Sequence, residues 1–322
     1  MPDIRLEPVQ AEDIDLLHDL VRRAEVADRV PLVTARSEVE EWRAGAHVDA
    51  GLDLRIALLG GEPAGWARVD HVPSGTGLER AYVFGAVVPE LRRRGVGTEL
   101  LDWGTERARE LLAAHEHDLP RFVRVHQYDW IDDAHALYRA GGFTPVRWFE
   151  DLLRPLDELP EPTVPEGLRI EPWDVARGEE ARLVKNAAFA DHWGSTPSSV
   201  ESWGEWLGGH GARPDLSLMA FAGDELVGVS VNEHYPDDEE LLGRRDGWIQ
   251  SLGVLGTWRG RGVASALIAH SLHAFARAGF THAALGVDTD NPTGAAGLYR
   301  RLGFQPMHRA VTSQIEVTPS PR

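Results

Sequence analysis

The stretch LRRRGVGTELL at residues 91–101 recurs 167 positions later, in altered form, as WRGRGVASALI at residues 258–268. In each copy an arginine and a turn of small residues, spaced R-x-x-G-x-(G/A), follow an apolar segment and open an amphipathic helix. Small residues let a ligand approach the backbone, and the first N–H groups of a helix attract an anion. The pattern therefore predicts a diphosphate-binding turn in each half of the chain. The residues expected to form it are Arg92, Arg94, Gly95 and Gly97 in the first copy and Arg259, Gly260, Arg261, Gly262, Val263 and Ala264 in the second.

Two more landmarks repeat in the same order. IRLEP at residues 4–8 recurs as LRIEP at residues 168–172, and AHALYRAGGF at residues 134–143 recurs as AAGLYRRLGF at residues 295–304. Similar offsets for three landmarks indicate a direct tandem repeat, and 322 residues suffice for two domains with a core each. Four prolines within residues 155–165 predict a stiff linker. We therefore expect domains at residues 1–154 and 167–322, joined by a linker at residues 155–166.

The hydrophobic periodicity of both halves predicts the same order of elements. In the second half we expect a strand at 168–171, helices near 179–188 and 198–207, strands at 216–222, 225–232 and 248–254, a long helix at 262–278, a strand at 283–287, a helix at 293–302 and strands up to residue 317. The first half follows this order, with its long helix at 95–114. The prediction is an α/β (α+β) fold, in which each domain has a mixed central sheet flanked by helices.

The composition excludes several kinds of protein. There is no cysteine, so disulfides, thiolate nucleophiles and cysteine-bound zinc are ruled out. The formal net charge of −18 argues against a nucleic acid or an anionic membrane as partner. We find no signal segment and no apolar run of membrane-spanning length, and the HEHD run at residues 115–118 predicts a solvated loop instead of a metal site. We expect a cytoplasmic monomer or homodimer without a metal ion.

The order of strand, R-x-x-G-x-(G/A) turn, long helix, strand, A-x-x-L-Y and G-F resembles the GNAT superfamily of acyl-CoA-dependent N-acyltransferases over nearly the whole chain. More narrowly, RPLDELPEPTVPEGLRIEP at residues 154–172 and KNAAFADH at residues 185–192 resemble tandem members of the mycothiol synthase type. The resemblance implies acetyl-CoA as cofactor, with its diphosphate on the amides of the second turn. It also implies that the pantetheine arm bonds to the backbone of Leu252 and Val254 and lies against Asn291.

For a member of this superfamily we expect transfer of an acetyl group to the primary amine of a small molecule. Tyr299 is the expected acid toward the departing thiolate, because a phenol with a pKa of about 10 keeps its proton at neutral pH; packing on the last helix is the alternative role. Tyr138 belongs to a poorer first half, since Trp130 stands where the second half has Asn291. We therefore expect catalysis in the second half, and a first half that is structural or binds CoA.

The proton acceptor for the amine is not evident from the sequence. Relatives carry a glutamate on the strand that leads into the turn, and Trp248 stands at the matching position, which predicts a changed acceptor pocket. His192 has the right intrinsic pKa for a base, although a lone histidine is more often a packing residue. Other possibilities are a relayed water and the side chains of Asp246, Gln250, His234, Glu233 and Asp191. We expect an acceptor pocket formed by Trp193, Trp248, Gln250 and His234.

Two other functions remain open at this point. Acylation of a protein lysine or N-terminus would need a long open groove instead of a closed pocket. A catalytically inactive protein that binds acyl-CoA as a sensor or scaffold is also possible, and the loss of the usual glutamate favours it.

Overall fold

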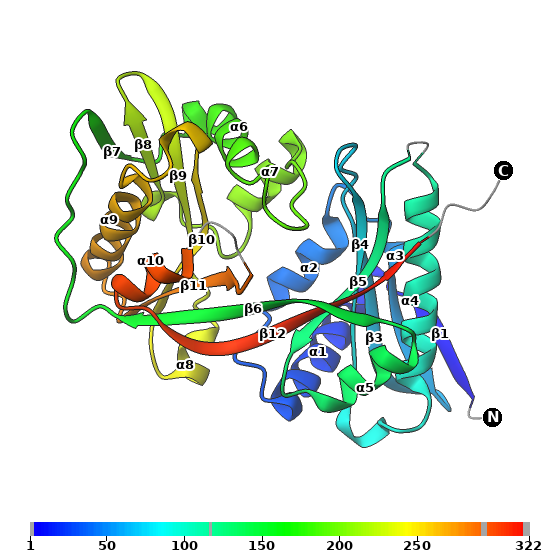
Figure 1. Ribbon diagram of the computed structural model, residues 1–322. Helices are drawn as coiled ribbons and strands as arrows, with labels where there is room; N and C mark the ends of the chain where they lie inside the picture. Colours follow the sequence, from blue (N-terminus) through cyan, green and yellow to red (C-terminus); the bar gives the residue numbers. More distant parts are fainter. Residues whose placement is uncertain (1–2, 116–117, 291–294, 318–322) are drawn as a thin grey trace. The chain divides into compact units, whose positions relative to one another are not determined.

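The computed structural model describes residues 3–115, 118–290 and 295–317, and the chain divides into two compact units (Figure 1). Unit 1 comprises residues 1–148 with 310–322, and unit 2 comprises residues 149–309. Both division points fall inside long strands. Strand β6 (Thr144–Pro155) begins in unit 1 and ends in unit 2, whereas β12 (Gln305–Glu316) begins in unit 2 and ends in unit 1.

Unit 1 is built on a mixed sheet with the strand order β1-β2-β3-β4-β5-β12. Neighbouring strands are antiparallel except β4 and β5, which are parallel. The bounds of these strands are β1 (Ile4–Pro8), β2 (Leu54–Leu59), β3 (Glu62–His71), β4 (Glu79–Val87) and β5 (Arg121–Tyr128).

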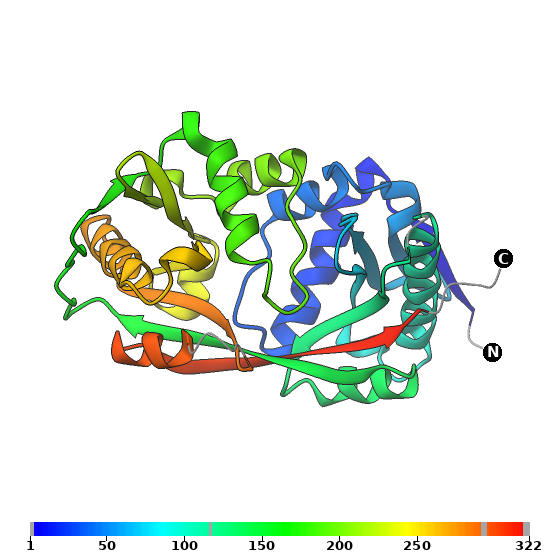
Figure 2. The same ribbon diagram turned by 45° about the horizontal axis from the view of Figure 1, so that its top comes forward.

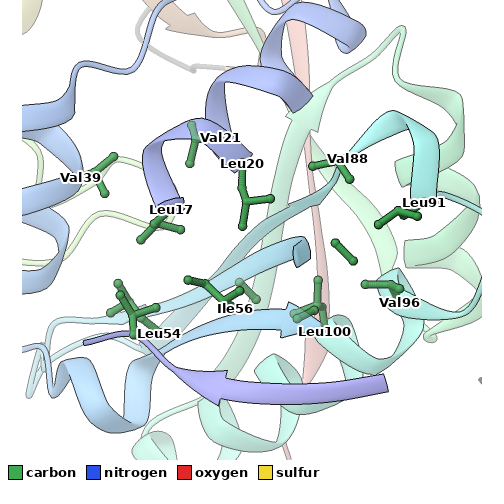
Figure 3. Close-up of a cluster of buried hydrophobic side chains, with 14 of the residues drawn as sticks. Leu17, Leu20, Val21, Val39, Leu54, Ile56, Val88, Leu91, Val96 and Leu100 are labelled. Atoms are coloured by element: carbon green, nitrogen blue, oxygen red, sulfur yellow. The ribbon is translucent and has the colours of Figure 1, made fainter. Parts of the chain in front are cut away.

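The helices of unit 1 bury apolar faces against this sheet. Along α1 the buried residues include Leu17, Leu20, Val21 and Ala24, the spacing of an amphipathic helix with one face in a core. They meet β2 and the first turns of α4, as Figure 3 shows for one cluster of the core. The bounds of the helices are α1 (Ile14–Asp28), α2 (Arg36–Ala44), α3 (Ala50–Asp53), α4 (Val96–Ala113) and α5 (Asp132–Ala140).

Unit 2 repeats this architecture with the strand order β7-β8-β9-β10-β11-β6. Here β10 and β11 form the parallel pair, and the other neighbours are antiparallel. The bounds are β7 (Leu168–Pro172), β8 (Leu218–Ala222), β9 (Glu225–Glu233), β10 (Asp246–Val254) and β11 (His282–Asp288).

Helices cover both faces of the unit 2 sheet (Figures 1 and 2). A Cβ built on Gly247 would lie 2.6 Å from Phe275 of α9, whereas one built on Gly253 would lie 3.2 Å from Ala188 of α6, so the two helices lie on opposite faces. The short helix α8 was not expected from the sequence. The bounds of the helices are α6 (Gly178–Ala188), α7 (Val200–Gly208), α8 (Asp238–Leu242), α9 (Val263–Arg277) and α10 (Ala295–Arg301).

Each sheet is completed by a strand from the other half of the sequence. Residues 310–316 of β12 pair with β5, and residues 149–155 of β6 pair with β11. Side chains follow the same exchange, since Ile315 packs in the core of unit 1 and Leu152 in that of unit 2. The expected ranges, 1–154 and 167–322, assign each closing strand to its own half of the sequence. The two strands follow the same motif in both repeats, so the sequence pattern alone does not distinguish which sheet each one closes.

Within the described residues, no helix has the length and apolar character needed to cross a bilayer.

Candidate active site

The two parallel strands of unit 2 diverge and leave a gap between them. Strands β10 and β11 pair at only three positions, from Asp246 opposite His282 to Trp248 opposite Ala284. Beyond these positions both strands continue, to Val254 and Asp288. A cavity of about 900 Å³ occupies this gap. Its walls come from both strands, the start of α9, α10 and the segment that follows α6.

A β-bulge lies at the point of divergence. On β10, Ile249 is opposite Asn232 of β9 and Ser251 is opposite Val231, so Gln250 has no partner in the ladder. The side chain of Gln250 is exposed and lines the cavity. A bulge bends its strand and interrupts the alternation of faces, which opens the sheet at this position. In unit 1 the ladder between β3 and β4 is regular from Gly65 to His71.

The backbone of β10 beyond the bulge points polar groups into the gap. The N–H of Leu255 donates to the carbonyl of Val227 on β9 at 3.0 Å. Because N–H and C=O groups alternate sides along an antiparallel strand, those of Leu252 and Val254 face away from β9. Both residues line the cavity. Unpaired strand groups of this kind can bond to an extended ligand as a further strand would.

The turn before α9 has the geometry of an anion-binding site. Arg259 is extended, Gly260 and Gly262 are left-handed with φ of 73° and 84°, and α9 begins at Val263. This path exposes the first N–H groups of α9, which have no partner within the helix. Five of the six predicted residues of the turn line the cavity, namely Arg259, Gly260, Gly262, Val263 and Ala264.

The two arginines of this turn differ in their contacts. Arg259 donates to the carbonyl of Ala188 at 2.6 Å and lies 3.8 Å from the carboxylate of Asp191, and its side chain is 37 % exposed. The guanidinium of Arg261 lies over the ring of Trp258, 4.9 Å from its centroid, and Arg261 is not among the lining residues. Of the two arginines of this turn, Arg259 is therefore the one that lines the cavity.

Tyr299 lies on α10 and lines the same cavity. Its ring meets that of Phe304 edge-on, with centroids 6.2 Å apart. Burial raises the pKa of Tyr299 to about 12. The phenol therefore keeps its proton throughout the neutral range and can act as a hydrogen-bond donor or an acid there.

The other predicted residues are placed unevenly. His192 lines the cavity, and its ring lies 5.5 Å from that of Phe189. Trp193 packs against Phe149, with centroids 6.4 Å apart, and Trp248 is half-buried; neither is among the lining residues. Asn291 lies outside the described residues.

His234 is not at the cavity, which corrects the expected pocket. It is buried, with one ring nitrogen 3.0 Å from the carbonyl of Asp246, the other 3.0 Å from Glu239, and its ring perpendicular to that of Phe280. Burial lowers the pKa of His234. Its position at the end of β9 directs the side chain into the core instead of the gap.

Two carboxylates considered as bases already have partners. Asp246 is buried and pairs with Arg244 at 2.9 Å. Glu233 is buried and accepts from Trp206 and from the hydroxyl of Tyr235. Burial raises the pKa of Glu233, and it is not among the lining residues of the cavity.

Unit 1 has a smaller counterpart of this site. Its strands β4 and β5 pair over only four positions before they diverge, and a cavity of about 410 Å³ lies there. Arg92, Gly95, Gly97 and Tyr138 line it, whereas Arg94 does not. Burial raises the pKa of Tyr138 to about 12.

The turn of unit 1 repeats the backbone of unit 2 with different side chains. Arg93 is left-handed with φ of 62° where unit 2 has Gly260, and Gly95 is left-handed at the start of α4. Arg92 forms a bidentate ion pair with Asp28, at 2.7 and 2.9 Å, and both residues line the cavity. An anionic ligand of unit 1 would need the guanidinium of Arg92, and the carboxylate of Asp28 already occupies the position next to it.

One cavity thus combines outward amides from a diverging pair of parallel strands, a helix start suited to an anion, and a protonated phenol. Together these features define a transferase site for an elongated anionic donor. The chain belongs to the Acetyltransferase (GNAT) family, whose model matches residues 16–143 and 181–304. It is an N-acetyltransferase with two domains of this family in tandem, and the prediction from the sequence is confirmed.

Similar proteins cover nearly the whole chain. A mycothiol acetyltransferase from Thermomonospora curvata is 32% identical and covers 77% of each chain, and one from Catenulispora acidiphila is 29% identical over 91% of this chain and 92% of its own. A GCN5-related N-acetyltransferase from Sphaerobacter thermophilus has a TM-score of 0.77 at 27% identity, covering 100% of this chain and 98% of that one. A tandem GNAT protein of the clavulanic acid pathway shares the fold, with a TM-score of 0.71 at 20% identity over 99% and 100% of the chains.

Proposed function

We propose that unit 2 transfers the acetyl group of acetyl-CoA to the primary amine of a small molecule. One observation carries this proposal: the start of α9, the outward amides of Leu252 and Val254, and the phenol of Tyr299 all border a single cavity. The donor needs an anion site, a strand-like arm and an acid near its thioester, and the cavity offers them in that order along β10 and α10.

The residues of unit 2 fit acetyl-CoA. The amides of residues 262–264 and the guanidinium of Arg259 would hold the diphosphate, and the backbone of Leu252 and Val254 would hold the pantetheine arm. Acetyl-CoA supplies an activated acyl group when bound. Tyr299 would hold a proton for the leaving sulfur, and an amide of β10 near the bulge would donate to the carbonyl oxygen, a contribution of roughly 3–4 kcal/mol in comparable enzymes.

A cationic amine suits the acceptor side. The net charge of −18 favours the approach of a cation, and Asp191 and His192 stand at the border of the cavity. Relatives bear the name mycothiol acetyltransferase, so a mycothiol-related amine is the first acceptor to test. Trp248 in place of a glutamate supports a changed acceptor within this class.

We assign unit 1 a structural role, with weak or no use of CoA. The ion pair with Asp28 neutralises Arg92 in the turn of unit 1, and the carboxylate repels a diphosphate. Cytoplasmic location and a monomeric or homodimeric state, expected from the sequence, belong to the same proposal.

Release of free CoA from acetyl-CoA, measured with a panel of amines and peptides, tests this function. We expect turnover with small amines, a loss of about 100-fold or more in kcat for Tyr299→Phe, and near-normal turnover for the matched variant Tyr138→Phe. Turnover of peptides alone would favour the acylation of proteins. Binding of acetyl-CoA without turnover of any acceptor would favour the sensor.

A further inference from the structure

Asp151 lies next to a residue that lines the cavity of unit 2, although it belongs to the first half of the sequence and is not itself among the lining residues. It is on β6 directly opposite Gly286 of β11, and Gly286 lines the cavity. A Cβ built on Gly286 would lie 3.7 Å from Oδ1 of Asp151, so the absence of a side chain there leaves the carboxylate uncovered. Asp151 is half-buried, and within the described part of the chain its carboxylate has no hydrogen bond or ion pair.

Strand pairing places Asp151 on the face of the unit 2 sheet that α6 covers, opposite α9. Trp248 and Ala284 are paired, and two residues further along β11 the same face carries Gly286 and therefore its partner Asp151. Gly247 points instead at α9, on the opposite face. Phe149, two residues before Asp151 on β6, contacts Trp193. The segment that follows α6 and carries His192 therefore packs against β6 on this face.

The two carboxylates of β9 and β10 that were considered as bases already have partners. Trp248 stands where relatives are expected to carry a glutamate, Asp246 pairs with Arg244, and Glu233 already accepts two hydrogen bonds. Burial raises the pKa of Asp151 to about 6, close to the value that suits a base at neutral pH. Titratable groups on the neighbouring elements include Asp288 on β11, His192 beyond α6 and His308 on β12, and burial alone raises the pKa of Asp151.

We propose that Asp151 is the proton acceptor for the amine substrate in unit 2, an inference that rests on the proposed function. Asp151 takes one proton from the ammonium group, and the nitrogen lone pair so released forms the bond to the thioester carbon. The carbon–sulfur bond breaks, and its electron pair leaves with sulfur, which takes the proton of Tyr299. Tyr299 regains a proton from the new amide nitrogen, and Asp151 passes its own to water.

The exchange of closing strands gives this proposal a consequence for unit 1. By the repeat offset of 161 residues, the position of Asp151 is held by Thr312 on β12. Thr312 hydrogen-bonds to His126 at 2.8 Å and carries no acidic group. Burial lowers the pKa of His126 to about 4, so this pair is a neutral core contact. Unit 1 therefore has no carboxylate at this position, and its Arg92 is paired with Asp28.

The pH dependence of kcat/KM for the amine tests the assignment. We expect wild-type activity to fall below an apparent pKa near 6, and Asp151→Asn to lose about 100-fold or more at pH 7.5 together with this acid limb. Asp151→Glu should recover part of the rate, whereas Asp157→Asn, an exposed aspartate just beyond β6, should behave as wild type. The KM for acetyl-CoA should not change. An acid limb that persists in Asp151→Asn, or that disappears in His192→Gln instead, overturns the proposal.

A second measurement separates this proposal from the proposed function. In the full chain, the carboxyl carbon of Asp151 is followed by NMR against pH and assigned with Asp151→Asn. Titration near pH 6 supports a base in this position, and titration below pH 5 overturns it, whether or not an acceptor is known. A wild-type protein that releases no CoA with any amine contradicts the proposed function, and with it the role of Asp151.

Discussion

Asp28 accepts two hydrogen bonds from the guanidinium of Arg92, at 2.7 and 2.9 Å, whereas the corresponding Arg259 lies 3.8 Å from Asp191. The side chains of Arg92 and Asp28 are 26% and 17% exposed, and those of Arg259 and Asp191 are 37% and 87% exposed. The first pair is thus partly desolvated and fixed, and the second is open to solvent. Since an arginine engaged by a carboxylate contributes little to phosphate binding, the two units should differ in their affinity for CoA.

Asp28→Asn should therefore create or strengthen a second CoA site. The substitution removes a negative charge from the cavity of unit 1 and frees Arg92, and we expect the weaker of two binding events to tighten about 10-fold, or about 1.4 kcal/mol. Isothermal titration with CoA measures both affinities. Asp191→Asn, the matched change in unit 2, should alter its site by less, because that carboxylate is exposed. An unchanged second site in Asp28→Asn would show that the ion pair is not what restricts unit 1.

The phenol of Tyr299 predicts the alkaline side of the pH profile. Because burial raises its pKa to about 12, Tyr299 stays protonated and its deprotonation should cause no loss of kcat between pH 7 and 10. The profile of kcat at saturating amine checks this, with Tyr299→Phe as reference. An alkaline limb below pH 10 that is present in wild type and absent from Tyr299→Phe would contradict a raised pKa.

The turn before α9 predicts a graded response to glycine substitution. Gly260 and Gly262 are both left-handed, but a Cβ on Gly262 would also lie 3.0 Å from Pro165, whereas one on Gly260 would meet nothing within 4 Å. Arg93 adopts the conformation of Gly260 in unit 1, so a side chain is tolerated there. Left-handed backbone costs a residue with a Cβ roughly 1–2 kcal/mol.

We therefore expect Gly262→Ala to raise the KM for acetyl-CoA and lower the melting temperature, and Gly260→Ala to do so less. Gly256→Ala is the control, because its φ is not positive and a Cβ there has open space. Initial rates against acetyl-CoA concentration and a thermal melt of each variant give the order. A larger change in KM or melting temperature for Gly260→Ala than for Gly262→Ala would contradict this order.

The sequence predicted the parts of the fold that follow from local patterns. The long helices were expected at residues 95–114 and 262–278, and they span Val96–Ala113 and Val263–Arg277. Glycine spacing and amphipathic periodicity determine both, and neither depends on distant contacts. The bulge at Gln250 could not be predicted, since it depends on the register of β10 against β9.

The environment of Asp151 shows a different limit. Its role depends on which sheet β6 closes, and that choice depends on long-range pairing with Gly286, 135 residues later in the chain. The prediction that His234 lines the pocket has a related weakness, because the sequence does not show which face a polar residue at the end of a strand will occupy. Alternation within one strand gives relative faces, and only the assembled sheet shows which face is the pocket.

Asp151 also predicts how stability depends on pH. Its pKa is about 6 in the folded chain and about 3.9 in an unfolded one, so between these values the folded state binds more protons. Stability from this group is therefore full below about pH 4 and is lost as the pH rises through about 6. Asparagine resembles the neutral acid in shape and carries no charge. Asp151→Asn should therefore remove the loss of stability at higher pH.

We expect Asp151→Asn to raise the melting temperature of unit 2 at pH 7.5 and to leave it unchanged at pH 4. For a unit of this size, each kcal/mol corresponds to about 2–4 °C. Differential scanning calorimetry at both pH values, with Asp157→Asn as control, measures the effect. A variant that is more stable at pH 7.5 yet slower in catalysis would show that the carboxylate is retained at a cost to the fold, as expected for a catalytic group and not for a structural one. Asp151→Asn that melts lower at pH 7.5 would instead place Asp151 among the residues that hold β6 against β11.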